Sequence, residues 1–224
     1  MDANFSDKVT HDLANTVVNA SLTSKGYGRV AAILDCAMEL LAEQGYAAVS
    51  LSEVARRTGI AKGNVQYYFS TNAALMRGVL TVQVAGLKAR WQRVLNEKHT
   101  DGRAKLAKLI SADMAVSRSE KHKSLALEKW AYANRDPEAR VIVHEWYSWV
   151  IEAYRDILGE LRPDLSRQEK LRLAALMNAV LEGSTPFFGR SRLQHAELSS
   201  MTRSIEQAIW TLVSNYPSGR RRVQ

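Results

Sequence analysis

The polar residues between Lys62 and Tyr67 are of the types that proteins use to contact DNA. A glutamine such as Gln66 can form two hydrogen bonds with adenine, and a tyrosine such as Tyr67 can reach a phosphate or a thymine methyl group. Lys62 adds positive charge, and Gly63 lets the start of a helix approach another backbone closely. Because an ordinary amphipathic helix with a solvated polar face has the same pattern, the surrounding sequence must decide between the two interpretations.

Two short helices are predicted to position these side chains. Ser50 and Glu53 have the spacing of a capping box, in which the hydroxyl accepts from the Glu53 amide and the carboxylate accepts from the Ser50 amide. Gly59 favours a helix stop because glycine readily adopts positive φ. In the second helix Val65 and Phe69 lie four residues apart and must face the core, which leaves the polar residues on the opposite face. The segment is therefore predicted to be a helix-turn-helix.

A longer pattern surrounds these two helices. It consists of Gly45-Tyr46, Ser50-Leu51-x-x-Val54-Ala55, Gly59-Ile60-Ala61-Lys62-Gly63-Asn64-Val65-x-Tyr67-Tyr68-Phe69 and Leu75. This pattern resembles the DNA-binding signature of TetR-family transcriptional regulators over about residues 29–80. The resemblance implies recognition-helix positions for Lys62, Gly63, Asn64, Gln66, Tyr67 and Tyr68, and positions near the DNA backbone for Ser50 and Ser52.

Two positions depart from the family pattern. Gln66 stands where a tyrosine is usual, and Asn72-Ala73 stands where Lys-Glu is usual. The phosphate contact of that lysine would therefore pass to Thr71, Asn72 or the helix N-terminus. We expect these departures to change the target sequence and the affinity rather than the fold.

The composition of the 224 residues favours a helical protein with a polyanionic partner. Hydrophobic residues make up 46%, and four prolines and twelve glycines leave room for long helical periodicities. The formal net charge is +8. Cys36 is the single cysteine, so no internal disulfide forms. Neither a signal peptide nor a run of about 20 apolar residues is present, so we expect a soluble cytoplasmic protein without a membrane segment.

We expect about nine helices in two domains. An N-terminal arm at 1–27 precedes a three-helix helix-turn-helix domain at 28–75, and the next helix continues to about 95. Residues 76–216 are expected to bind an effector and to dimerise, and residues 217–224 form a basic tail. The expected helices lie at about 28–44, 51–58, 61–69, 71–95, 103–115, 119–134, 136–161, 166–183 and 197–215.

Apolar residues cover more than one face of the last two expected helices, which indicates that these helices pack against another chain. In the TetR family such helices pair with their copies in a four-helix bundle. One short recognition helix contacts few base pairs, so specific binding needs two helix-turn-helix domains that contact half-sites about 34–36 Å apart. We therefore expect a homodimer, formed through the helices at 166–183 and 197–215, on near-palindromic double-stranded DNA.

Aromatic residues concentrate between positions 130 and 154. Ordinary core packing and an effector pocket both account for them. The stretch Trp130-Ala131-x-Ala133-x-x-Asp136-Pro137-x-x-Arg140 resembles the C-terminal domain of BetI-type regulators, which control choline and betaine metabolism. That resemblance implies a quaternary ammonium effector held by aromatic rings. The residues expected to line the pocket are Trp130, Trp146, Tyr147, Trp149 and Met177.

The sequence contains no motif typical of catalysis. It lacks a Cys/His cluster with metal-ligand spacing, a glycine-rich phosphate loop after a strand and a Ser/His/Asp arrangement, so we expect no enzyme activity, metal or cofactor. The expected function is a repressor that a small-molecule effector releases from its operator. An activator of the same fold stays open, as does a helical protein-interaction adaptor, which would show no salt-dependent affinity for DNA.

Overall fold

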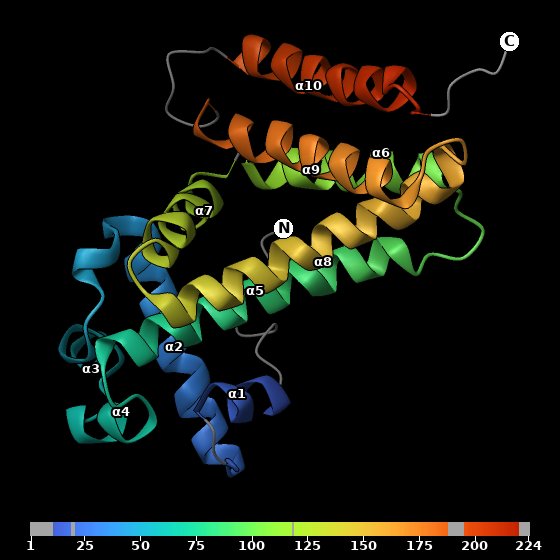
Figure 1. Cartoon of the computed structure of the whole chain (residues 1–224). Coiled ribbons are helices and arrows are strands. Elements are labelled where there is room, and N and C mark those ends of the chain that lie inside the picture. The colour runs from blue at the N-terminus through green and yellow to red at the C-terminus, as the bar shows by residue number, and fades with distance from the viewer. Residues whose placement is uncertain (1–10, 19–20, 118, 188–194, 220–224) are drawn as a thin grey trace, which may run out of the picture. The chain divides into compact units, whose positions relative to one another are not determined.

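The computed structural model describes residues 11–18, 21–117, 119–187 and 195–219. These residues contain ten α-helices, two short 3-10 helices and no strand, which confirms the predicted all-α class (Figure 1). The helices are α1 (His11–Val18), α2 (Ser24–Gln44), η2 (Tyr46–Ala48), α3 (Leu51–Thr58), α4 (Lys62–Tyr68), α5 (Asn72–Leu95), α6 (Gly102–Ser117), α7 (Glu120–Ala133), α8 (Pro137–Leu161), α9 (Arg167–Ser184), η3 (Thr185–Phe187) and α10 (His195–Asn215).

The structure has one helix more than the nine expected. This helix is α1, and it lies in the segment expected to be an N-terminal arm. Side-chain oxygens of Asn15 and Thr23 accept hydrogen bonds from backbone amides just before and within the first turn of α2. The Leu22 amide donates to Asn15 Oδ1 at 2.8 Å, and the Gly26 amide donates to Thr23 Oγ1 at 3.2 Å. Thr23 is thus the N-cap of α2, which begins at Ser24 rather than at 28. The predicted start was too late because the polar composition of this segment outweighed the signal of its cap.

Two compact units make up the chain. The first comprises residues 1–89 together with 124–144, and the second comprises 90–123 together with 145–224. The division falls inside three helices, α5, α7 and α8, so each of these helices belongs partly to both units. The helix-turn-helix, α7 from residue 124 onward and the first part of α8 therefore form one unit.

Side chains of α2, α3, α4 and α5 build the core of the first unit. Ile33, Val54 and Val65 are fully buried, and Phe69 is 1% exposed. Phe69 packs where α5 passes closely at Gly78, since an added Cβ there would lie 3.0 Å from a ring carbon of Phe69. This core fixes α4 against its neighbours and leaves its other face free for contacts outside the chain.

A polar network joins α7 and the start of α8 to the helix-turn-helix within this unit. The Tyr132 hydroxyl donates to Asp136 Oδ2 at 2.8 Å, and Arg77 Nη1 of α5 donates to the same oxygen at 3.0 Å. The ring of Tyr132 stacks on Tyr46 of η2, with 5.1 Å between the centroids. Asp136 Oδ1 also caps α8 by accepting from the Ala139 amide at 2.9 Å. One carboxylate thus connects three elements.

Aromatic rings form the centre of the second unit. Trp91 of α5 is 3% exposed and meets Trp146, Trp149 and Tyr154 of α8 edge-on, with 6.0, 5.9 and 4.9 Å between centroids. The Trp91 indole nitrogen donates to Asp113 Oδ1 of α6 at 3.3 Å. Burial raises the pKa of the Tyr154 phenol well above its ordinary value. The cluster therefore holds α5, α6 and α8 together as a packed core.

The end of α8 is tied to the end of α10. Arg162 Nη2 donates to the Tyr216 carbonyl at 2.8 Å, and its Nη1 donates to the Val213 carbonyl. Asp164 pairs with the same guanidinium at 2.7 Å. Arg162 thus satisfies carbonyl groups that the last turn of α10 leaves without helical partners. A complete capping box of Ser166 and Glu169 starts α9.

Candidate nucleic-acid interface

The two faces of α4 differ as the periodicity predicts. Val65 and, just beyond the helix, Phe69 are buried, while the predicted contact residues on the other side are open to solvent. Tyr67 is 79% exposed, the largest value among the exposed large hydrophobic side chains. A tyrosine held this far out of the core is available to a partner. The exposed residues of this face are Lys62, Gly63, Asn64, Gln66 and Tyr67.

Gly63 has no internal reason to be glycine. A Cβ atom added to it would meet nothing within 4 Å, and the residue lies in a helix. Gly59, in contrast, has φ of 69° and ends α3 in the left-handed conformation, as predicted. The lack of a side chain at Gly63 therefore favours the close approach of something outside the chain.

Tyr68 differs from the other residues predicted on this helix. It is half-buried, and its ring meets that of Tyr67 edge-on at 5.1 Å. An added Cβ at Gly26 would lie 3.5 Å from the Tyr68 hydroxyl oxygen, so this hydroxyl lies beside the first turn of α2. Tyr68 thus supports Tyr67 and packs on α2.

The start of α3 contains half of the predicted capping box. Ser50 Oγ accepts from the Glu53 amide at 3.1 Å, as predicted. The prediction of the reciprocal bond is wrong, because the Glu53 carboxylate instead accepts from Arg56 Nη2 at 2.6 Å and from Arg57 Nε at 3.3 Å. Hydrogen bonds to a guanidinium are charge-assisted and stronger than one to a neutral amide. The bond from Arg56, followed by that from Arg57, lowers the pKa of Glu53 to about 2.

The predicted backbone-contacting residues meet where α3 and α5 begin. Ser52 and Thr71 are exposed, and Thr71 Oγ1 caps α5 by accepting from the Ala74 amide at 3.0 Å. Asn72 Oδ1 accepts from the Leu51 amide at 3.0 Å. Asn72 therefore caps α3 across 21 positions of sequence, a role that helical periodicity cannot indicate.

The predicted effector residues are divided between the two units. Trp146 and Trp149 stack with 5.5 Å between centroids, in the aromatic cluster of the second unit. The Tyr147 hydroxyl donates to Glu182 at 2.8 Å, and Met177 is fully buried. Trp130 belongs to the first unit and is 44% exposed. Trp91 was missed because it lies on the long helix α5, away from the aromatic-rich stretch.

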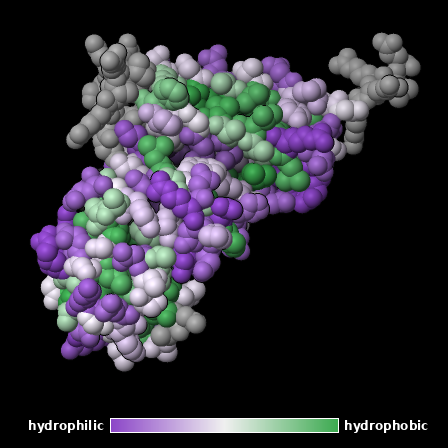
Figure 2. All heavy atoms as spheres, turned by 60° about the vertical axis from the view of Figure 1, so that its left-hand side comes forward, coloured by the Kyte–Doolittle hydropathy of each residue, from purple (hydrophilic) through white to green (hydrophobic). Residues whose placement is uncertain are grey.

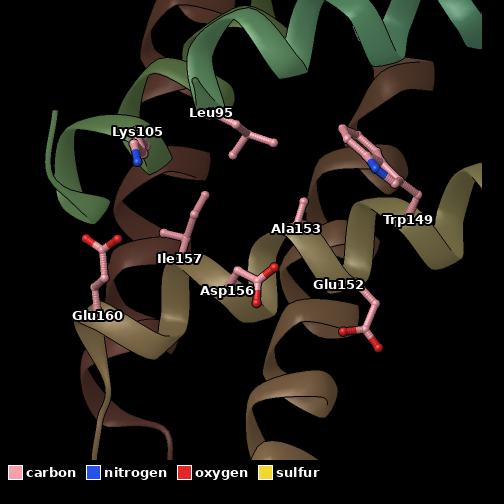
Figure 3. Close-up of a pocket in the computed structure, with 8 residues that line it drawn as sticks. All are labelled: Leu95, Lys105, Trp149, Glu152, Ala153, Asp156, Ile157 and Glu160. Atoms are coloured by element: carbon pink, nitrogen blue, oxygen red, sulfur yellow. The ribbon is translucent and has the colours of Figure 1, made fainter. Parts of the chain in front are cut away.

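A cavity of about 420 Å³ opens beside the second half of α8 (Figure 3). Trp149 is the one residue of the expected pocket set that lines it. No group of His, Cys, Asp and Glu among the described residues is arranged to hold a metal ion. No helix in the described ranges is both long and apolar enough to cross a membrane. The cavity is lined by Leu95, Lys105, Trp149, Glu152, Ala153, Asp156, Ile157 and Glu160.

Comparison with known proteins matches the segment that carries this interface. Residues 33–79 match the family model of bacterial regulatory proteins, tetR family. The fatty acid metabolism regulator protein of Bacillus subtilis (strain 168) is 25% identical over 181 residues, which cover 67% of this chain and 90% of that protein. The two matches agree on a transcriptional regulator.

Solved structures share the fold. A TetR-family regulator from Mesorhizobium loti has a TM-score of 0.69 at 18% identity, covering 86% of this chain and 98% of its own. One from Legionella pneumophila has 0.66 at 18% identity, with 84% and 98% covered. A transcriptional regulator from Saccharomonospora viridis in complex with choline has 0.65 at 20% identity, with 80% and 93% covered. At these identities the likeness establishes the fold alone.

The matched segment runs from α2 through η2, α3 and α4 into α5. It contains both the buried core that fixes α4 and the exposed polar face that the core leaves open. Residues 33–79 therefore form a DNA-binding domain of the tetR family, and sequence pattern, fold and relatives agree on a regulator of this type.

Proposed function

We propose that the protein is a repressor that binds a near-palindromic DNA operator as a homodimer and leaves it when a small molecule binds. The observation that carries the proposal is the exposed polar face of α4 above its buried core. The face combines an amide, a phenol, an ammonium group and a glycine, which together suit base edges and phosphates in a major groove. The operator would be met in the cytoplasm.

Within this face the residues have different proposed roles. Gln66 and Tyr67 contact bases, with Asn64 beside them, and Lys62 contacts a phosphate. Residues at the starts of α3 and α5 contact the backbone on either side, where exposed helix N-termini favour anions. Asn72 contributes by holding the start of α3, and Tyr68 by supporting Tyr67. The proposed backbone contacts are Ser50, Ser52, Thr71 and Asn72.

The proposed dimer forms through α9 and α10. Leu176 of α9 is 47% exposed, and Ala175 and Ala179 are exposed on the same face. In Figure 2 hydrophobic residues gather across the upper part of the surface, which in Figure 1 is formed by α9 and α10. Small side chains beside a leucine allow two helices to pack closely. Sedimentation that shows a monomer with undiminished specific binding would contradict the dimer.

Release by an effector is proposed to pass along α5 and α8. Each of these helices belongs to both units, so a shift at one end changes what the other end packs against. Asp136 at the start of α8 reaches Arg77 of α5 and, through Tyr132, Tyr46 of η2. Two relatives are named with a class of small molecule. The Bacillus protein is a regulator of fatty acid metabolism, and the Saccharomonospora protein was solved in complex with choline.

The proposal is tested by selecting bound duplexes from a randomised DNA library with the purified chain. We expect an enriched sequence with two symmetric half-sites about one helical turn apart. Gln66→Ala should enrich a different sequence, because alanine cannot make the bidentate pair of hydrogen bonds to a base. A library that stays random for the wild type would refute the proposed function. An unchanged consensus for Gln66→Ala would refute the base contact assigned to that residue.

A further inference from the structure

The cavity beside α8 has an apolar floor and an aromatic end. Leu95, Ala153 and Ile157 form the floor, and Trp149 and Glu160 lie at opposite ends (Figure 3). Its volume of about 420 Å³ falls in the range of small-molecule pockets. The cavity is therefore large enough for a small amphiphile whose apolar part lies on the floor.

The polar rim of the cavity is acidic although the chain as a whole is basic. Glu152, Asp156 and Glu160 are spaced four residues apart on one face of α8, and Lys105 is the one basic lining residue. Counted alone, the lining residues carry a net negative formal charge, which Arg155 and Arg167 offset in part through ion pairs with Glu152 and Asp156. A ligand with an anionic headgroup would meet repulsion here, whereas a cation would meet attraction.

The three carboxylates differ in how far their charge is already compensated. Arg155 pairs with Glu152 and with Asp156, each at 2.8 Å, and Arg167 pairs with Glu152 at 2.9 Å. Glu160 Oε2 accepts from the Gly102 amide at 2.7 Å, and a neutral donor does not cancel its charge. Asp156 is 71% exposed and can turn toward a ligand at small cost. Among the described residues, Glu160 is therefore the one of the three carboxylates that pairs with no arginine, and its charge is the least compensated.

Trp149 offers a second feature that suits a cation. Its ring is held by stacking on Trp146, at 5.5 Å and 21°, and by an edge contact with Trp91 at 5.9 Å. The ring is half-buried, so part of it borders the cavity. A fixed indole attracts cations through its π-electrons and costs no conformational entropy on binding.

We infer that this cavity is the effector site and that its ligand is an organic cation with an apolar tail, not an acyl anion. The tail would lie on Leu95, Ala153 and Ile157. The cationic head would lie against Asp156 and Glu160 or over Trp149. The inference rests on the proposed function, because it names the ligand class of the release step.

Two probes with six-carbon chains and headgroups of opposite charge test the ligand class. Hexyltrimethylammonium and hexanoate are titrated into the full chain in a calorimeter. We expect saturable binding of the cation and none of the anion over the same concentrations. Equal or tighter binding of hexanoate, or no binding of either probe, overturns the inference.

Paired variants test the site. Asp156→Asn combined with Glu160→Gln should weaken cation binding by about fivefold or more, because the variant removes two partly exposed attractions. Glu145→Gln removes the same kind of charge from an exposed position of α8 outside the lining and should leave binding unchanged. Cation binding that the double variant does not weaken refutes the site.

Operator binding, measured in parallel without probe, separates the two proposals. Loss of all sequence-specific DNA binding refutes the proposed function whatever the calorimetry shows. Specific DNA binding together with failure of the cation to bind refutes only the inference about the ligand. Addition of hexyltrimethylammonium should also weaken operator binding, and hexanoate should not.

Discussion

Replacing Gly63 by alanine separates the internal role of this position from its external one. Inside the chain the new methyl group meets nothing within 4 Å, so the packing of the fold is unchanged. Alanine in a helix is favoured over glycine by about 0.5–1 kcal/mol, and the first turn of the short helix α4 should gain the lower part of that range. Gly63→Ala should therefore keep or slightly raise the melting temperature.

DNA binding by the same variant should fall. The exposed surface at Gly63 is proposed to lie against the operator, where a methyl group would keep the start of α4 from its close approach. We expect affinity to fall by about tenfold, equivalent to about 1.4 kcal/mol, measured by fluorescence anisotropy with a labelled operator. Gly159→Ala is the matched control, since it adds a methyl group to an open helical position in the second unit.

If Gly63 lies against the operator, Gly63→Ala should keep or raise the melting temperature while it lowers operator affinity. Unchanged operator affinity would show that nothing approaches α4 at this point. A melting temperature several degrees lower would show instead that glycine is needed inside the fold. Either result would refute the assignment, whereas Gly159→Ala should leave DNA affinity as it is.

Three further predictions concern contacts around the helix-turn-helix. Asn72→Ala removes the acceptor of the Leu51 amide and should lower the free energy of unfolding by about 1 kcal/mol. Asn72→Asp keeps the acceptor, so it should melt no lower than the wild type, but its negative charge should weaken DNA binding. Equal melting temperatures of Asn72→Ala and the wild type would exclude the cap. The pKa of Glu53 is lowered from 4.5 to about 2, so its carboxylate stabilises the folded state fully above pH 4.5 and loses this effect toward pH 2. The difference in melting temperature between the wild type and Glu53→Gln should therefore shrink between pH 4.5 and pH 2. A constant difference would contradict the pairing with the arginines. Arg77→Ala removes one partner of Asp136 and should reduce the effect of the effector on operator affinity more than it reduces operator affinity itself. An anisotropy titration with and without effector measures both quantities. An effector response equal to that of the wild type would exclude this contact from the coupling between effector and DNA binding.

Local signals in the sequence predict much of the helix-turn-helix. The pair Val65 and Phe69 identifies the buried face of α4, and Gly59 identifies the end of α3, because helix periodicity and positive φ are local properties. Position 166, where a helix is expected to start, is the N-cap of α9, and its capping box is likewise a local property. These elements were predicted from a few neighbouring residues each.

Contacts between distant positions could not be predicted in this way. Asn72 caps α3 through the amide of Leu51, and Glu53 pairs with two arginines instead of the nearby amide of Ser50. Trp130 stands in an aromatic-rich stretch but lies in the other unit from Trp149. Such outcomes depend on competition between partners and on how helices pack, which one sequence alone does not specify.

The most direct test of the central claim is the salt dependence of binding to the selected operator and to a shuffled duplex. The account predicts tighter binding to the operator and a linear fall of log K with log salt concentration. Lys62→Ala should reduce that slope by about 0.9 for each phosphate that the lysine neutralises, while the preference for the operator remains. Equal affinity for both duplexes at every salt concentration would contradict the claim that α4 reads DNA.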